Sequence, residues 1–283
     1  MLIDTHAHLN FDVYKNDADQ VIKRTLESDV WIINIGTQYD TSKKAVEIAQ
    51  NYPQGVYASI GLHPIHLETG LVKIKNDTEE IEVKTREEEF DYEKYKNLAK
   101  SKKMVAIGEI GLDYYYKPKT KRKLELFKKK QRSVLCQQLK LAKELNLPVI
   151  FHCRIAHQDL IEVLNSKFKI QNSKITGVIH CFTGTWEQAG QYLEMGLYLG
   201  FNGIIFKLNL DEIIKKTPLE RILIETDCPY LTPPPMVGRN EPFYVRYIAE
   251  RIAKVKNLSF QDLSKITTEN AKRLFTRLNF HVY

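Results

Sequence analysis

Metal-ligand residues stand at the ends of strand-like apolar runs along this chain. Five short runs rich in Val, Ile and Leu are each followed by histidine, glutamate or aspartate. The runs are 2–5 before His6 and His8, 104–108 before Glu109, 148–151 before His152, 176–179 before His180, and 221–226 before Asp227. Because active-site residues of barrels lie at the carboxyl ends of parallel strands, we expect these side chains to share one barrel mouth. The pattern indicates a metallohydrolase.

The rest of the chain supplies enough elements to close such a barrel. Three further runs, 31–36, 56–61 and 197–200, have the continuous apolar character of strands buried on both faces. Stretches with apolar residues at three- and four-residue spacing predict the helices, at 17–28, 41–52, 121–145, 157–167, 185–196, 208–216, 242–255 and 259–278. Ser259 is the expected N-cap of the last helix. We predict a single (β/α)8 TIM barrel over residues 1–283, with no linker dividing it.

Composition restricts the class of protein only loosely. With 283 residues and 43% hydrophobic content the chain can bury a large core, and its net charge of +7 permits attraction to polyanions such as nucleic acids. The four cysteines form no CxxC pair, which favours reduced thiols in a cytoplasmic protein. No apolar run reaches the roughly 20 residues that span a bilayer. We expect a cytoplasmic monomer with no membrane partner.

Two charged segments interrupt the regular scheme. Residues 68–93 carry a cluster of acids, which we interpret as a solvated insertion because charge runs seldom pack. Residues 117–130 are rich in lysine and follow the strand of Glu109. Since loops after barrel strands emerge on the active face, we expect Lys117, Lys119 and Lys121 to meet a phosphate backbone.

His6 and His8 are two residues apart at the end of the first run. Side chains at this spacing on a strand point to the same side, so both imidazoles can reach one ion. Imidazole pairs suit Zn2+, Mn2+ or iron better than Ca2+. The sequence therefore predicts a transition-metal or related divalent site beginning at these residues.

Glu109 follows small and branched residues, where a buried carboxylate without a cation is costly. Its two oxygens could bridge two ions, and a salt bridge to Arg154 is the alternative. In the bridging arrangement, one ion is held with His6, His8 and Asp227, and the other with His152 and His180. Asp227 is also the candidate general base that accepts a proton from an attacking water. We expect its neighbour Glu225 to face the other side of the strand.

Three residues near the ligands are candidates for substrate contact. Arg154 could bind phosphate oxygens as a fork, or pair with a carboxylate such as Asp159. His63, just beyond the third strand, could donate a proton or hold a substrate oxygen. Tyr114 begins a run of three tyrosines and offers a ring either for base stacking or for the core.

These residues lie in motifs that resemble the TatD family of metal-dependent deoxyribonucleases, within the amidohydrolase superfamily. The motifs follow the family's order over nearly the whole chain: IDTHAHL at 3–9, GLHP at 61–64, GEIGLDY at 108–114, LPVIFHCR at 147–154, HCFTG at 180–184, ETDCPYL at 225–231 and RNEP at 239–242. The resemblance implies a barrel with the same six ligands, and hydrolysis of DNA phosphodiesters, often from a 3′ end. Cys153, Ile155 and Val237 depart from the residues that the family commonly carries.

We therefore expect a hydrolase that cleaves phosphodiester bonds of DNA, as a 3′-5′ exonuclease on single strands or 3′ ends, with two divalent ions (Mg2+, Mn2+ or Zn2+) as cofactors. Its catalytic residues would be Asp227, Glu109, His63 and Arg154. One alternative is hydrolysis of an ester or amide, such as an aminoacyl-tRNA link or a small lactone, on the same metal centre. The other is a barrel that binds nucleic acid without turnover.

Overall fold

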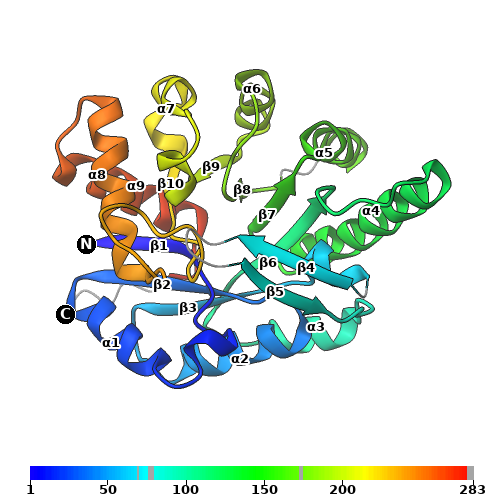
Figure 1. The fold of residues 1–283 in the computed structure, drawn as a ribbon, viewed down its shortest axis with the longest axis horizontal. Coiled ribbons are helices and arrows are strands. Elements are labelled where there is room, and N and C mark those ends of the chain that lie inside the picture. Colours follow the sequence, from blue (N-terminus) through cyan, green and yellow to red (C-terminus); the bar gives the residue numbers. More distant parts are fainter. Residues whose placement is uncertain (69, 76–79, 172–174, 279–283) are drawn as a thin grey trace.

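Eight parallel strands form a nearly closed barrel that is surrounded by helices (Figure 1). The structure, a computed structural model, describes residues 1–68, 70–75, 80–171 and 175–278. The barrel strands, in spatial order, are β1 (Leu2–Ala7), β2 (Val30–Ile35), β3 (Val56–Ile60), β6 (Met104–Asp113), β7 (Val149–Arg154), β8 (Gly177–Ile179), β9 (Tyr198–Phe201) and β10 (Ile222–Ile224). The predicted (β/α)8 barrel is confirmed, and all eight predicted runs are strands.

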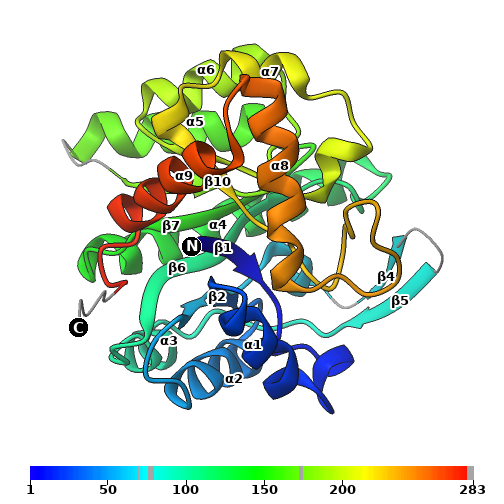
Figure 2. The ribbon, with the colours of Figure 1, turned by 90° about the vertical axis from the view of Figure 1, so that its left-hand side faces the viewer.

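The helices pack around the outside of the strands (Figures 1 and 2). Their bounds are α1 (Ala18–Glu27), α2 (Tyr39–Gln50), α3 (Tyr92–Leu98), α4 (Lys121–Glu144), α5 (His157–Gln171), α6 (Trp186–Glu194), α7 (Asp211–Lys216), α8 (Val245–Lys256) and α9 (Phe260–Leu274). Short 3-10 helices occur at Asp12–Tyr14, Pro64–Leu67, Gly203–Phe206, Leu219–Arg221 and Pro242–Tyr244. The hydroxyl of Ser259 accepts a hydrogen bond from the N–H of Asp262, which confirms the predicted N-cap of α9.

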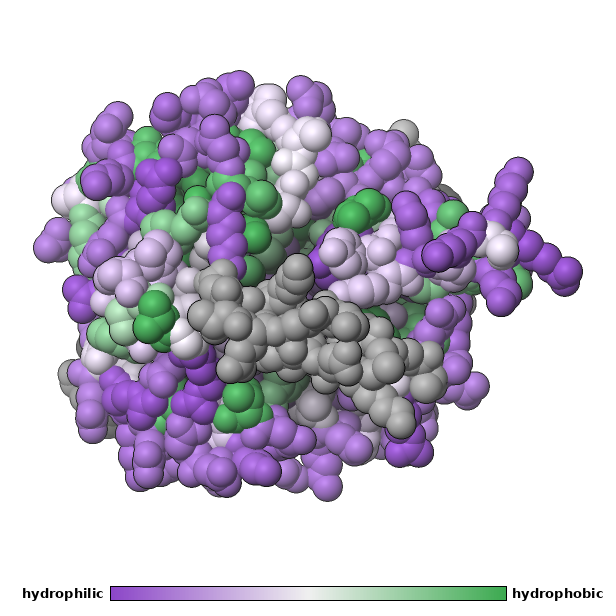
Figure 3. Space-filling model, viewed as in Figure 1, coloured by the Kyte–Doolittle hydropathy of each residue, from purple (hydrophilic) through white to green (hydrophobic). Residues whose placement is uncertain are grey.

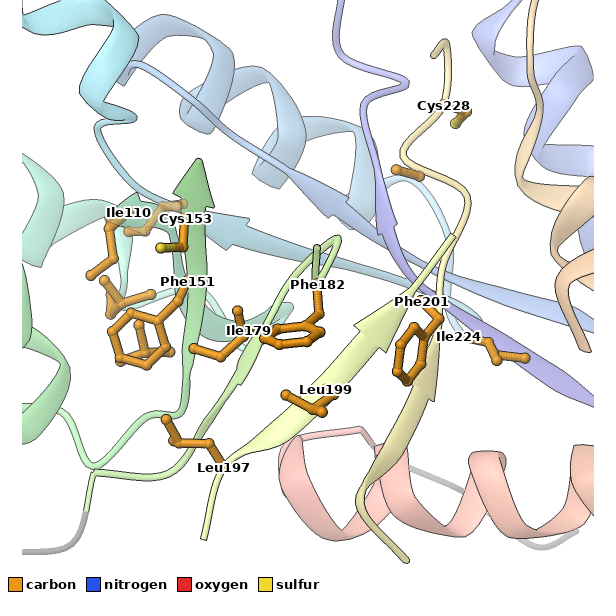
Figure 4. Close-up of a cluster of buried hydrophobic side chains, with 14 of the residues drawn as sticks. Ile110, Phe151, Cys153, Ile179, Phe182, Leu197, Leu199, Phe201, Ile224 and Cys228 are labelled. Carbon is orange, nitrogen blue, oxygen red and sulfur yellow. The ribbon is translucent and has the colours of Figure 1, made fainter. Parts of the chain in front are cut away.

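Apolar side chains form two layers because successive residues of a strand face opposite sides. Ile3 and Ile33 belong to the inner layer, whereas their neighbours Leu2 and Ile32 belong to the outer layer beneath the helices. Figure 4 shows part of the outer layer on β7 to β10. Phe275, just after α9, packs with the inner layer. The end of α9 therefore helps to fill the interior of the barrel, away from the candidate ligands.

The barrel closes between its first and last strands through backbone contacts beyond β10. The N–H of Asp227 donates to the carbonyl of His6 at 2.8 Å, and the N–H of His8 donates to the carbonyl of Cys228 at 2.9 Å. A parallel bridge joins Ala7 to Cys228. Closure thus occurs at the ligand-bearing ends of the two strands.

The acidic insertion is more ordered than predicted. Its backbone forms an antiparallel hairpin of β4 (Gly70–Lys75) and β5 (Glu80–Thr85), which projects from the barrel in Figure 2. Glu79 and its neighbours 76–78 lie outside the described residues. The half-buried Glu88 accepts hydrogen bonds from the backbone N–H of Tyr39 at 3.1 Å and the hydroxyl of Tyr95 at 2.9 Å. The solvated interpretation is wrong for Glu88, because its carboxylate satisfies an otherwise free N–H at the start of α2.

The surface is largely hydrophilic on the face drawn in Figure 3, where polar side chains also project at the outer end of α4. Among the helices of the described residues, none combines the length and the hydropathy that crossing a bilayer requires.

Candidate metal centre

The six predicted ligands converge at one mouth of the barrel. Nε2 of His6 lies 3.2 Å from Nε2 of His8 and 3.8 Å from Oδ1 of Asp227. The same Asp227 oxygen lies 3.5 Å from Nε2 of His8 and 3.9 Å from Nε2 of His180. His6, His8 and His180 are buried, and Asp227 is partly buried. Residues up to 221 positions apart in the chain therefore present their donor atoms to one small volume.

Glu109 stands between two groups of histidines, with one carboxylate oxygen toward each. Oε2 lies 3.4 Å from Nε2 of His6 and 3.9 Å from Nε2 of His8. Oε1 lies 2.8 Å from Nδ1 of His152 and 3.6 Å from Nε2 of His180. Burial alone would raise the pKa of Glu109, but the surrounding imidazoles lower it well below its usual value. The side chain is thus an ionised carboxylate that faces two groups of ligands, and its predicted alternative, a salt bridge to Arg154, is not formed.

Backbone and carboxylate partners orient two of the histidines. Nδ1 of His8 lies 3.0 Å from the carbonyl of Ile35, which can only accept a hydrogen bond. Nδ1 of His180 lies 2.8 Å from Oε1 of Glu225. In both cases a proton belongs on Nδ1, so Nε2, which points into the cluster, is the nitrogen that can bind a metal ion. Glu225 was expected to face away; that prediction is wrong, because residues two apart share a side and Glu225 lies two before Asp227.

His152 is held between two carboxylates. Its Nδ1 faces Glu109, and its Nε2 lies 3.1 Å from Oδ2 of Asp113. Burial alone would lower the pKa of His152, but the contacts with Asp113 and Glu109 outweigh burial and raise it to about 9. The other Asp113 oxygen accepts the backbone N–H of Tyr115 at 2.8 Å. Asp113 was absent from the predicted site, although it is an acidic residue in the motif GEIGLDY that follows the strand of Glu109, which was a usable signal.

His63 lies inside the cluster, with Nε2 3.5 Å from Oε1 of Glu109 and its ring 4.1 Å from that of His152. Its Nδ1 accepts a hydrogen bond of 3.0 Å from the backbone N–H of Ile65. A neutral imidazole that accepts at Nδ1 carries its proton on Nε2. His63 therefore offers an N–H donor toward the centre and has no lone pair left for a metal ion in this arrangement.

Two buried amides of α4 fix the loops that carry His63 and Asp113. The side chain of Gln138 accepts from the N–H of Leu62 at 2.8 Å and donates to its carbonyl at 3.0 Å. Gln131 makes the same pair of bonds with the backbone of Asp113, at 2.8 and 2.9 Å. Their seven-residue spacing places both amides on one face of the helix. Sequence reasoning read α4 only as an outer, lysine-rich helix and missed this function.

Asp4 is a further buried carboxylate beside the ligands. It accepts hydrogen bonds from the N–H and hydroxyl of Thr226, at 2.9 and 2.6 Å, and from the N–H of His6 at 3.2 Å. These bonds tie β1 to the segment that carries Asp227. Asp4 was not among the predicted site residues, and its position two residues before His6 was the signal.

The donor set fits divalent metal ions. Among the described residues, four groups bring their possible ligand atoms within 4.8 Å of one another, including His6, His8 and Asp227, and also His6, Glu109 and His180. In tetrahedral coordination with metal–ligand bonds of roughly 2.0–2.1 Å, two ligand atoms lie about 3.4 Å apart. This is close to most of the distances given above between nitrogen and oxygen atoms of the candidate ligands. Imidazole nitrogens combined with carboxylate oxygens are typical ligands of Zn2+ and Mn2+.

A family model described as "TatD related DNase" matches residues 3–276. The chain belongs to this family. It is therefore a TatD-family metal-dependent hydrolase. A Bacillus subtilis relative named "Uncharacterized metal-dependent hydrolase YabD" is 40% identical, over 99% of this chain and 100% of the relative. A protein of Escherichia fergusonii named "3′-5′ ssDNA/RNA exonuclease TatD" is 32% identical, over 97% of this chain and 98% of that protein. The crystal structure of the Escherichia coli TatD homologue YjjV superposes with a TM-score of 0.80 at 26% identity, covering 97% of this chain and 98% of that one.

The structure places the predicted substrate residues of this TatD-family protein in different environments. Tyr114 is 3% exposed and donates its hydroxyl to Asp159 at 2.8 Å, so the prediction that its ring stacks on a base is wrong. Tyr115, the next residue, is the exposed one. Asp159 contacts Lys128 and Arg132. The alternative pairing of Asp159 with Arg154 is therefore not formed.

The three predicted lysines follow the strand of Glu109 in the chain, and all three are exposed. Lys117 and Lys119 belong to the loop between β6 and α4, and Lys121 begins α4. This loop leaves the barrel at the end of the strand that carries Glu109. Their contact with a phosphate backbone stays a prediction.

Proposed function

We propose that this TatD-family protein hydrolyses phosphodiester bonds at the 3′ ends of DNA, with two divalent ions held at the barrel mouth. The observation that carries the proposal is Glu109, whose two oxygens face different groups of histidine nitrogens. A carboxylate with this surrounding is suited to bridge two cations. His6, His8 and Asp227 would hold one ion, and His152 and His180 the other.

When bound, such ions polarise a phosphoryl oxygen and make water a better nucleophile at neutral pH. The protein's own groups supply the rest. The partly exposed carboxylate of Asp227 accepts a proton from the attacking water. His63 donates a hydrogen bond from Nε2 to a phosphoryl oxygen, since its Nδ1 is occupied by Ile65. Arg154 holds a neighbouring phosphate through its N–H groups.

The names of relatives support this substrate class to different degrees. The Escherichia fergusonii relative is named as an exonuclease of single-stranded DNA and RNA with 3′-5′ polarity. The more similar Bacillus subtilis relative is named only as an uncharacterized metal-dependent hydrolase. The exposed lysines after β6 favour a polyanion, because each neutralised phosphate releases counterions and strengthens binding.

The decisive experiment uses protein stripped of metal and single-stranded DNA labelled at either end. Adding Mg2+, Mn2+ or Zn2+ should restore cleavage, with a labelled mononucleotide released first from the 3′-labelled strand. An aminoacyl ester and a small lactone should be tested in parallel. Turnover of one of these in place of DNA, or DNA cleavage at full rate in excess chelator, would refute the proposal.

Charge replacement tests the lysine contact separately. The triple variant Lys117→Ala, Lys119→Ala, Lys121→Ala should weaken DNA binding and reduce its salt slope by roughly two units for a single strand. A matched triple variant removes the same charge from outer helices: Lys43→Ala, Lys254→Ala, Lys265→Ala, all at exposed positions. Equal salt slopes for the two variants would remove the loop after β6 from the DNA contact.

A further inference from the structure

An exposed pair of planar side chains stands beside the candidate metal centre. The guanidinium carbon of Arg154 lies 3.6 Å from the centroid of the Tyr115 ring, which is the separation of two groups in stacking contact. Both side chains are exposed, and the Tyr115 residue is 49% accessible. The pair lies at the carboxyl ends of β6 and β7, the face of a barrel where active sites are built.

The pair is fixed to the ligands by hydrogen bonds. Asp113 contacts His152 through one carboxylate oxygen, at 3.1 Å, and accepts the N–H of Tyr115 through the other, at 2.8 Å. Arg154 is two residues beyond His152 on β7, and its carbonyl accepts the N–H of Tyr114 at 2.9 Å. Tyr115 and Arg154 therefore keep a set distance from the centre, since one carboxylate orients both a ligand and the ring-bearing backbone.

Among the residues that the structure describes, Arg154 forms no salt bridge with a carboxylate. The nearby Asp159 is instead paired with Arg132 at 2.8 Å and Lys128 at 3.1 Å. With its face against Tyr115, the guanidinium keeps its N–H edges available for an anion. Ile155, which is 61% exposed at a φ of 56°, adds an apolar surface next to it.

We propose that Tyr115 and Arg154 form a stacking platform for an unpaired nucleotide base next to the phosphate at the metal centre. The inference rests on the proposed function for the ligand class, and it adds the subsite that receives the base. A flat aromatic and cationic surface accepts the π-face of any base, so the platform selects for a base that is free of a duplex stack and not for its identity. The guanidinium edges would meet the adjoining phosphate.

The test is a binding measurement that needs no turnover. The probe is a single-stranded phosphorothioate DNA with 2-aminopurine at its 3′ end, whose fluorescence is quenched on stacking, added to the metal-loaded protein. The parent should quench it. Tyr115→Ala should lose the quenching and bind about tenfold more weakly, the loss expected for one stacked base. Tyr115→Phe, which keeps the ring, should behave as the parent.

Arg154→Lys separates stacking from charge, because lysine keeps the charge but has no planar face. Part of the quenching should disappear in this variant, whereas a purely electrostatic Arg154 would leave the quenching intact and overturn its place in the platform. On cleavable DNA, the parent should prefer a 3′-terminal base over an abasic 3′ end by about tenfold, and Tyr115→Ala should lose that preference.

The outcomes distinguish this inference from the proposed function. Quenching that depends on Tyr115, without cleavage of any phosphodiester, would support the platform and refute the nuclease. Cleavage with equal quenching by the parent and Tyr115→Ala would support the nuclease and refute the platform. Failure of the probe to bind the parent would also refute the platform.

Discussion

The backbone N–H of Asp227 donates a hydrogen bond of 2.8 Å to the carbonyl of His6, so two candidate ligands are joined at the point where the barrel closes. The first strand of the barrel and the segment after its last strand thus meet at the candidate metal centre. An ion bound by both side chains would add a second connection across this closure.

Bound metal should therefore stabilise the folded protein as well as support hydrolysis. Removal of metal should lower the melting temperature, and adding an ion at 100 times its Kd should stabilise the native state by about 2.7 kcal/mol. Calorimetry of the stripped and reloaded protein checks this. An unchanged melting temperature at saturating metal would argue against a site that bridges the two strands.

Replacement of Glu109 tests the bridge. Glu109→Gln keeps the shape but replaces one oxygen by an amide nitrogen that cannot bind a cation, so metal content should fall at both positions. His152→Ala should empty mainly one position, because its imidazole faces only Oε1 of Glu109. Elemental analysis measures both variants, and two ions retained in Glu109→Gln would exclude bridging.

Asp227→Asn should reduce cleavage by roughly a hundredfold or more, the loss expected when a general base is removed. The amide keeps the size of the side chain, and the backbone bond to His6 is unaffected. Because Asp227 is also a candidate ligand, rate and metal content must be measured on the same sample. Near-parental turnover with normal metal content would remove this carboxylate from the mechanism.

Asp113→Asn tests the orientation of His152. The carboxylate of Asp113 holds Nε2 of His152, so the amide should weaken metal binding at that position by about ten- to a hundredfold, the usual effect of losing such a partner. Asp17→Asn is a matched control, since Asp17 pairs with Arg239 away from the six ligands. Equal metal affinity in the two variants would mean that Asp113 serves only the backbone of Tyr115.

Metal binding should release protons at neutral pH. Burial alone would lower the pKa of His180, but Glu225 and Asp227 outweigh it and raise the pKa to about 10, and the pKa of His152 is raised to about 9. Since an imidazole must lose a proton from its ligand nitrogen, apparent affinity should rise with pH until these pKa values are passed. Calorimetric titration with Mn2+ at pH 7.5, in buffers of different ionisation enthalpy, counts the protons. No release at that pH would show neutral histidines in the metal-free protein.

The sequence by itself determined the barrel and the grouping of the candidate ligands. Strands and helices follow from the spacing of apolar residues, which is a local property, and ligands at the ends of parallel strands must meet wherever the strands close. For this reason the sequence alone could group His6, Glu109 and Asp227. The hairpin β4–β5 was not predicted because the acidic composition of 68–93 favours a solvated loop, and the short helix α3, which begins at Tyr92, was not predicted either.

Only the tertiary structure decided which side chains support the ligands. Glu225 supports His180 through a contact of 2.8 Å with Nδ1, which joins the end of β10 to the end of β8. Among three consecutive tyrosines, contacts with α4 and α5 bury Tyr114 and leave Tyr115 exposed. The donor role of His63 depends on one backbone N–H, from Ile65. Such choices depend on contacts between elements distant in the chain or on local backbone geometry, neither of which is contained in the periodicity of a sequence.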